Sequence, residues 1–262
     1  MKKLQRIFYF LFLFTLSIAL LGCASSKKET DPKKVLQNAQ QKNSELSSND
    51  LTMKLDMNID VSGKSLTMGM EMNCKSINDE ASPQLALTGS IDSMGMSIPM
   101  EMYYKDNYLY LNILNQKMKQ AMPLDDIKNQ MIPSTQTFSL PEDAYKEISM
   151  TEDGSSQVIT FTADGSKMTE SVNSLLSTLQ SQLGDNVSYT LNDVTGTITV
   201  NEEGYFTEEI LHIPMTADIP ESGEVTMDLT CTITIHDPGK NDLSIDFPDF
   251  SDFVESDLSN IV

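Results

Sequence analysis

The feature that most constrains this chain is a strict alternation of apolar and polar residues over unusually long stretches. Between positions 51 and 61 every odd residue is apolar and every even residue is polar. A period of two places all the apolar side chains on one face of a β-strand. The alternation resumes after Ser62-Gly63, which favours a tight turn, and continues from position 66 to 74. The sequence therefore predicts a long amphipathic hairpin.

The same period recurs along most of the chain, and only a few segments have helical spacing instead. A helix is predicted over 31–46, because Asp31-Pro32 is typical of a helix start, and another over 166–184, where apolar residues form one stripe. A shorter helix is expected at 123–131. Further strands are expected at 84–92, 95–105, 107–113, 116–121, 145–152, 156–163, 187–200, 205–217, 224–236 and 243–247.

These elements indicate a mainly β domain of the α+β class. Several of the expected strands exceed the usual length of about five or six residues, and long strands coil strongly. We therefore predict a single curved antiparallel sheet of about ten strands that forms a half-barrel, with two main helices on its concave side. A β-sandwich is the alternative, although it would need two matched inner faces.

The first 22 residues are typical of a secretory signal peptide. Three basic residues precede an apolar stretch at 7–21, which is too short for a transmembrane helix. The stretch ends in Leu20-Leu21-Gly22-Cys23, which resembles the lipobox of bacterial lipoproteins. This resemblance implies transfer of a diacylglyceryl group with palmitate-type chains to the Cys23 sulfur, cleavage before Cys23, and anchoring by at least two acyl chains at the extracellular face of the cell membrane. An ordinary cleaved signal with an incidental cysteine is the alternative.

The chain divides into four parts on this interpretation. Residues 1–22 form the signal peptide, and residues 23–30 form a polar tether that follows the lipidated cysteine. Residues 31–250 form the folded domain, and residues 251–262 form an acidic tail.

Charge and missing motifs exclude two classes of function. The chain has 18 basic and 38 acidic residues, and its single arginine, Arg6, lies in the signal peptide. A mature protein of this composition cannot hold a nucleic-acid backbone. The sequence has no G-x-S-x-G, H-E-x-x-H or glycine-rich phosphate loop, and neither His212 nor His236 has a recognisable partner spacing. We expect a protein that is not an enzyme and that uses no cofactor.

Methionine is abundant, with 17 residues, and several recur at a spacing of two. Thioether sulfurs could bind Cu(I). The spacing, however, places them on one strand face beside Leu66 and Ile98, which favours an apolar surface suited to varied ligands and predicts no metal site. The residues expected to line a ligand cavity are Met53, Met57, Met68, Met70, Met72, Met96, Met100 and Met102.

Two cysteines remain after Cys23. Cys74 and Cys231 are in phase with apolar neighbours, so both side chains should point inward. An extracellular location permits a disulfide between them. The bond requires Cα atoms within about 7 Å of each other, and two buried free thiols are the alternative.

Motifs at turns and strand ends resemble a known group. Residues 103–110, Tyr-Tyr-Lys-Asp-Asn-Tyr-Leu-Tyr, and the closing pair Asp237-Pro238-Gly239 and Ile245-Asp246-Phe247-Pro248 occur together with the lipobox and the long first hairpin. This combination resembles Gram-positive surface lipoproteins that are similar in layout to the LolA and LppX/LprG lipoprotein superfamily. The resemblance covers most of residues 31–250. It implies a half-open barrel with helices over an apolar cavity, which carries lipids in the better-known members.

The predicted function follows from the anchor and the cavity. We expect a membrane-anchored extracellular lipoprotein that binds a lipid or another apolar ligand in a methionine-lined cavity, as a carrier or chaperone. The alternative is a non-enzymatic surface interaction or envelope-assembly module with a self-filled core. A cavity of several hundred Å³ between sheet and helices would separate the two.

Overall fold

The computed structural model describes residues 29–61, 63–79, 82–93, 95–123, 140, 142–168, 188–219, 223–240 and 242–256. The chain forms two units, Met1–Thr30 and Asp31–Val262. The predicted signal peptide and Cys23 lie outside the described residues. The helices and strands of the described residues all belong to the second unit.

The second unit opens with helix α2, Pro32–Ser44. The Asp31 side chain caps it by accepting a hydrogen bond from the backbone N–H of Lys33 at 3.0 Å, and proline occupies the first turn. Val35, Leu36 and Ala39 are buried on one side of the helix. The helix predicted over 31–46 is thereby confirmed.

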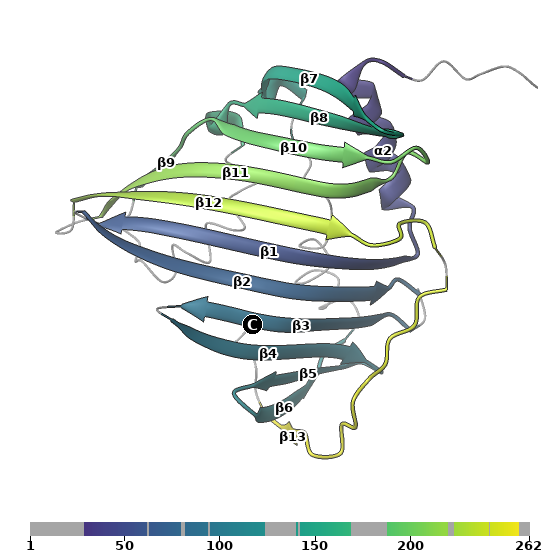
Figure 1. Ribbon diagram of the computed structural model, residues 1–262. Coiled ribbons are helices and arrows are strands. Elements are labelled where there is room, and N and C mark those ends of the chain that lie inside the picture. Colours follow the sequence, from purple (N-terminus) through teal and green to yellow (C-terminus); the bar gives the residue numbers. More distant parts are fainter. Residues whose placement is uncertain are drawn as a thin grey trace, which may run out of the picture. The chain divides into compact units, whose positions relative to one another are not determined.

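One open, curved sheet contains all thirteen strands of the described residues (Figure 1). Its order is β13-β6-β5-β4-β3-β2-β1-β12-β11-β10-β8-β7, and β9 pairs with β11. All pairs are antiparallel except β13 with β6. The strands are β1 Ser48–Val61, β2 Lys64–Ile77, β3 Gln84–Ser93, β4 Met96–Lys105, β5 Tyr108–Ile113, β6 Gln116–Ala121, β7 Tyr145–Asp153, β8 Ser156–Ala163, β9 Ser188–Leu191, β10 Val194–Val200, β11 Phe206–Ile219, β12 Gly223–Ile235 and β13 Val254–Glu255.

The sheet confirms the prediction of a mainly β domain on a single curved sheet, and the sandwich alternative is wrong. The prediction of about ten strands is too low. One reason is that the strand predicted over 187–200 is divided into β9 and β10. The carbonyl of Pro214 accepts a hydrogen bond from the backbone N–H of Asn192 at this break. Proline has no N–H to return on the same side, so the ladder is interrupted there.

The sheet has two unlike faces. The inner face carries the alternate residues that form the buried core, such as Leu51, Cys74 and Leu211, and it also packs against the apolar side of α2. Helix α2 contacts β7 and β11, and Figure 1 shows it beside that end of the sheet. The outer face carries the residues between them, mostly polar. Most methionines of the first half of the sheet lie on β1, β2 and β4.

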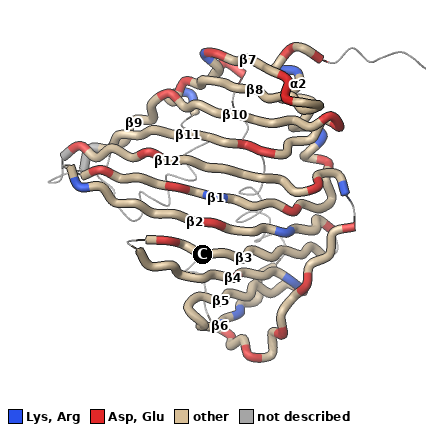
Figure 2. The backbone as a smooth tube through the Cα atoms, in the orientation of Figure 1, with Lys and Arg blue, Asp and Glu red and all other residues tan. Residues whose placement is uncertain are grey.

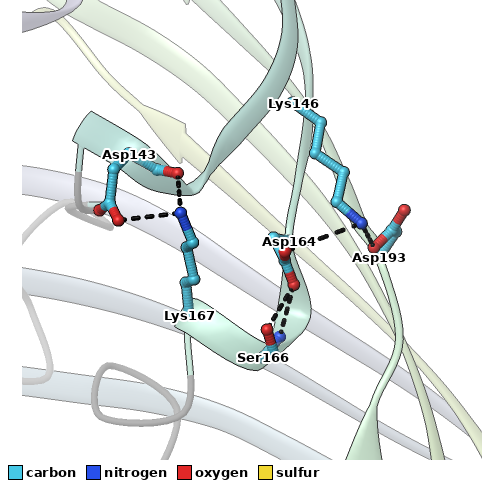
Figure 3. Close-up of polar contacts among 6 residues, drawn as sticks. All are labelled: Asp143, Lys146, Asp164, Ser166, Lys167 and Asp193. Atoms are coloured by element: carbon cyan, nitrogen blue, oxygen red, sulfur yellow. Dashed lines mark hydrogen bonds and ion pairs between the residues drawn. The ribbon is translucent and has the colours of Figure 1, made fainter.

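In the described residues α2 is the one α-helix. Most of the helix predicted over 166–184 lies outside these residues, as does nearly all of the one predicted over 123–131. The first residues of the longer segment form a short 3₁₀ turn, Gly165–Lys167. Asp164 caps this turn through the backbone N–H and the hydroxyl of Ser166, and Lys146 bridges Asp164 and Asp193 at 3.9 and 2.6 Å (Figure 3).

The C-terminal strap, residues 243–256, covers the outer face of β4–β6. The Phe250 ring stacks on Tyr110 with ring centroids 3.8 Å apart, and Phe253 is buried edge-on against the same ring. Strand β13 then adds to the edge of β6. The predicted acidic tail is therefore packed on the sheet as far as residue 256.

No strand forms at 243–247, where one was predicted. Phe247 instead packs edge-on against Tyr103 of β4, with centroids 6.2 Å apart, and Lys105 lies over its ring at 4.9 Å. The two motifs at 103–110 and 245–248 are thus in direct contact. Packing of aromatic side chains replaces the backbone pairing that the alternation suggested.

Candidate ligand-binding face

The eight methionines predicted to line a cavity lie on the inner face of β1, β2 and β4. Met53 is directly opposite Met72, and Met57 is directly opposite Met68. Met70 faces Leu55. On β4, Met96, Met100 and Met102 face positions 93, 89 and 87 of β3. The register thus brings methionines of the first hairpin into contact range across the strands.

Exposure on this face rises along the strands in one direction. On β2 the exposed fraction increases from 0% at Cys74 through 3% at Met72 to 37% at Met68. On β4 it increases from 8% at Met102 to 64% at Met96. The inner face of β1–β4 is therefore closed at the end near Leu51 and opens toward the hairpin tips.

The inner face of strands β11 and β12 is less exposed than that of β1–β4. Leu229 is opposite Met57, which is opposite Met68, so these three residues form one cross-strand row. Leu229 is nevertheless 3% exposed, and Val225 and Met227 nearer the tip are also buried. The opening thus lies over β1–β4 and not over β11–β12.

Gly89 interrupts the methionine row in the middle of this face. It lies between Met72 on β2 and Met100 on β4. A Cβ atom at Gly89 would overlap the carbonyl oxygen of Glu71, so only glycine fits this backbone. The group that approaches closely at Gly89 is the neighbouring β2 backbone itself.

A buried carboxylate also belongs to the inner face. Glu209 of β11 is 1% exposed and lies opposite Ile198 and Ile233 in the register. Burial raises the pKa of Tyr145 to about 12, and the negative charge of Glu209 adds to this rise. Sequence reasoning missed Glu209, although the phase of the strand, with Leu211 two residues later, would have placed it inward.

Of the two alternatives for Cys74 and Cys231, a disulfide or two free thiols, the structure has free thiols. Strand β1 lies between them: Cys231 is opposite Leu55, and Cys74 is opposite Leu51. Two strand spacings amount to about 9–10 Å, which exceeds the Cα separation that a disulfide allows. Burial raises the pKa of Cys74 to about 12 and that of Cys231 to about 11, so both are unreactive thiols.

Two cavities lie elsewhere in the described part of the chain. One, of about 560 Å³, lies over β7, β8, β10 and β11. The other, of about 240 Å³, lies beside the start of β1 and the loop after β12, where His236 contacts Thr52 at 2.9 Å. Neither is lined by a methionine.

Metal-binding clusters and membrane-spanning helices are absent from the same described residues. Histidine, cysteine and carboxylate side chains form no group of three or more that could hold a metal ion there. No helix within the described ranges has both the length and the apolar character needed to cross a membrane.

Comparison with known proteins identifies the family. Residues 31–241 match the model of a family of unknown function, DUF6612. The chain belongs to this family. No curated protein sequence matches it.

Solved structures provide distant likenesses. The chain is similar to LprF from Mycobacterium bovis, with 10% identity over 84% of this chain and 98% of that chain and a TM-score of 0.42. It is also similar to the lipoprotein LppX from Mycobacterium tuberculosis, with 11% identity over 82% and 100% of the two chains and a TM-score of 0.41.

Proposed function

We propose that this protein is a membrane-anchored extracellular lipoprotein that binds a lipid or another apolar ligand on the inner face of its sheet and acts as a carrier or chaperone without enzymatic activity. The observation that carries this proposal is the graded exposure of the inner face over β1–β4. A continuous apolar surface that is buried at one end and exposed at the other has the form of a site with an entrance.

The side chains of this face suit a flexible apolar ligand. Methionine is unbranched and polarisable, and it adapts to ligands of different shape. Met72 and Met100 lie on either side of Gly89 in one cross-strand row, and Met53 extends this row on β1. An acyl chain would contact thioether and methylene groups throughout this region.

Anchoring through Cys23 would hold the protein at the membrane. Two acyl chains give stable attachment, whereas one gives marginal binding. In a Cys23→Ala variant we expect the protein to leave the membrane fraction or to remain as uncleaved precursor. Cys74→Ala is the matched control and should stay in the membrane fraction. Normal processing and palmitate labelling of Cys23→Ala would disprove the anchor.

Ligand binding is tested with a fluorescent fatty acid and the chain lacking residues 1–22. Met70→Trp fills the inner face and should weaken binding by at least about tenfold, whereas Glu71→Trp places the same side chain on the outer face and should not. Far-UV circular dichroism checks the fold of both variants. Equal affinity in the two variants would exclude the inner face as the site.

A second candidate function is an interaction or envelope-assembly module with a self-filled core. It is favoured by the position of the two cavities in the described residues, since neither is lined by a methionine. If the purified protein binds neither fatty acid nor phospholipid at micromolar concentration, this module replaces the carrier.

A further inference from the structure

The cavity of about 560 Å³ lies on the outer face and is separate from the apolar inner face. Four neighbouring strands, β7, β8, β10 and β11, form its floor. One cross-strand row in it runs from Ser149 through Thr160 and Thr197 to Ile210. The adjacent row runs from Glu147 through Thr162 and Thr195 to His212. The volume of the cavity is within the range of small-molecule sites.

Five residues that line this cavity carry a hydroxyl group, and their side chains recur across the strands at the spacing of about 4.8 Å: Ser149, Thr160, Thr162, Thr195 and Thr197. Each hydroxyl can donate one hydrogen bond and accept two. Ser149 and Thr160 bond to each other at 2.8 Å, and His212 contacts Thr230 at 3.3 Å. Within the described ranges, Glu147 and Thr197 have side chains with no hydrogen bond or ion pair, so their polar atoms are free to bind a ligand.

The charges around the cavity restrict the ligand. Glu147 lies in the cavity, and Asp228 lies 3.9 Å from His212. Lys146 is already engaged by Asp193 at 2.6 Å. Figure 2 shows that acidic residues are widespread on the strands of the sheet. Phosphates, sulfates and other anions are disfavoured by this field, whereas neutral groups with many hydroxyls are not.

We propose that the outer-face cavity is a binding site for a short neutral saccharide. Saccharide hydroxyls would exchange hydrogen bonds with the threonine row, and the Glu147 carboxylate would accept bonds from two adjacent hydroxyls. The apolar side chain of Ile210 would contact the C–H groups of a sugar ring. This site goes beyond lipid binding and does not depend on it, because it occupies the opposite face of the sheet.

The test uses the full-length chain in a detergent without sugar groups. Ligand-observed saturation-transfer NMR and titration calorimetry would be recorded with triacetylchitotriose and with cellotriose. We expect at least one probe to bind with a Kd of about 1 mM or tighter. Trigalacturonic acid, an anionic sugar of similar size, should not bind. No saturation transfer from either neutral probe at about 10 mM, or equal binding of the anionic sugar, would overturn the proposal.

Variants then locate the site. The double variant Thr195→Val, Thr197→Val removes two hydroxyls while retaining β-branched side chains, and it should weaken binding by about tenfold. Glu147→Gln tests the exposed carboxylate and should also weaken binding. Thr88→Val, on β3 outside the cavity, is the control and should bind normally. Unchanged affinity in both cavity variants would overturn the assignment.

Discussion

The inner faces of β11–β12 and of β1–β4 have the same alternation but different environments. Leu229 and Met68 belong to one row across β12, β1 and β2, yet Leu229 is buried and Met68 is exposed. Packing around each strand, and not the pattern along it, decides which side chains leave water. The comparison teaches that an apolar face can be buried core in one half of a sheet and partly open to solvent in the other.

The largest expected effect comes from truncating the two ends of this row. Leu229→Ala should lower the free energy of unfolding by about 2–5 kcal/mol, because it removes buried methyl groups and leaves a cavity. Met68→Ala should change it by less than about 1 kcal/mol, since that side chain is already exposed. Urea denaturation of both variants measures the difference. Equal losses would contradict the assignment of an open and a closed half.

Glycines on opposite faces give the next effect. Gly89→Ala should destabilise by about 1–3 kcal/mol, because the new Cβ would collide with the Glu71 carbonyl on the open half. Gly69→Ala is the control: its Cβ would have no neighbour nearer than 3.8 Å, so the change should be neutral or stabilising by about 0.5–1 kcal/mol. The same denaturation experiment applies. A harmless Gly89→Ala would show that β2 and β3 are farther apart.

Cysteine alkylation sharpens the comparison further. At pH 8 both thiols are protonated, because burial raises their pKa values to about 12 for Cys74 and about 11 for Cys231. We expect little labelling by iodoacetamide in the native protein, and slower reaction at the fully buried Cys74 than at the partly exposed Cys231. Mass spectrometry of the intact protein measures the extent of labelling over time, and peptide mapping assigns it to each cysteine. After denaturation without reductant, both cysteines should be labelled. If neither is labelled, the two cysteines form a disulfide.

The smallest effect concerns the ion pairs near β7. The Lys167 ammonium holds the pKa of Asp143 below its ordinary value of 3.8, and the Ser166 hydroxyl lowers that of Asp164. A lowered pKa in the folded state adds stability above the ordinary pKa, which is lost as pH falls through the folded value. Lys167→Met should lower Tm by about 1 °C at pH 7 and by less at pH 3. A larger loss at pH 3 would contradict this.

Local patterns in the sequence predicted much of the fold. The first hairpin, helix α2 and the hairpins that follow depend on alternation, capping and turn residues, all of which act between near neighbours. The prediction of a strand at 243–247 was wrong. Apolar and polar residues alternate there as they do in a strand, but Phe247 packs on Tyr103 and the backbone does not pair. The break between β9 and β10 depends on Pro214, which lies on a different strand.

The candidate sites were less predictable than the fold. Phase placed the methionines and both cysteines on the inner face, and the cysteines are indeed buried or partly buried there. The alternation along a strand carries no information on the order of strands in the sheet, so it could not show that β1 separates the two cysteines. The hydroxyl-lined cavity joins four strands from separate hairpins, and no single segment indicates it.

The sequence by itself determined the long amphipathic strands, the cap of α2 and the acidic character of the chain, because each depends on the residues of one segment. Only the tertiary structure decided the pairing of β1 with β12, the burial of Glu209, the separation of the cysteines and the opening over β1–β4. These depend on which distant segments share hydrogen bonds and exclude water together, and that choice is made by the free energy of the whole packed sheet.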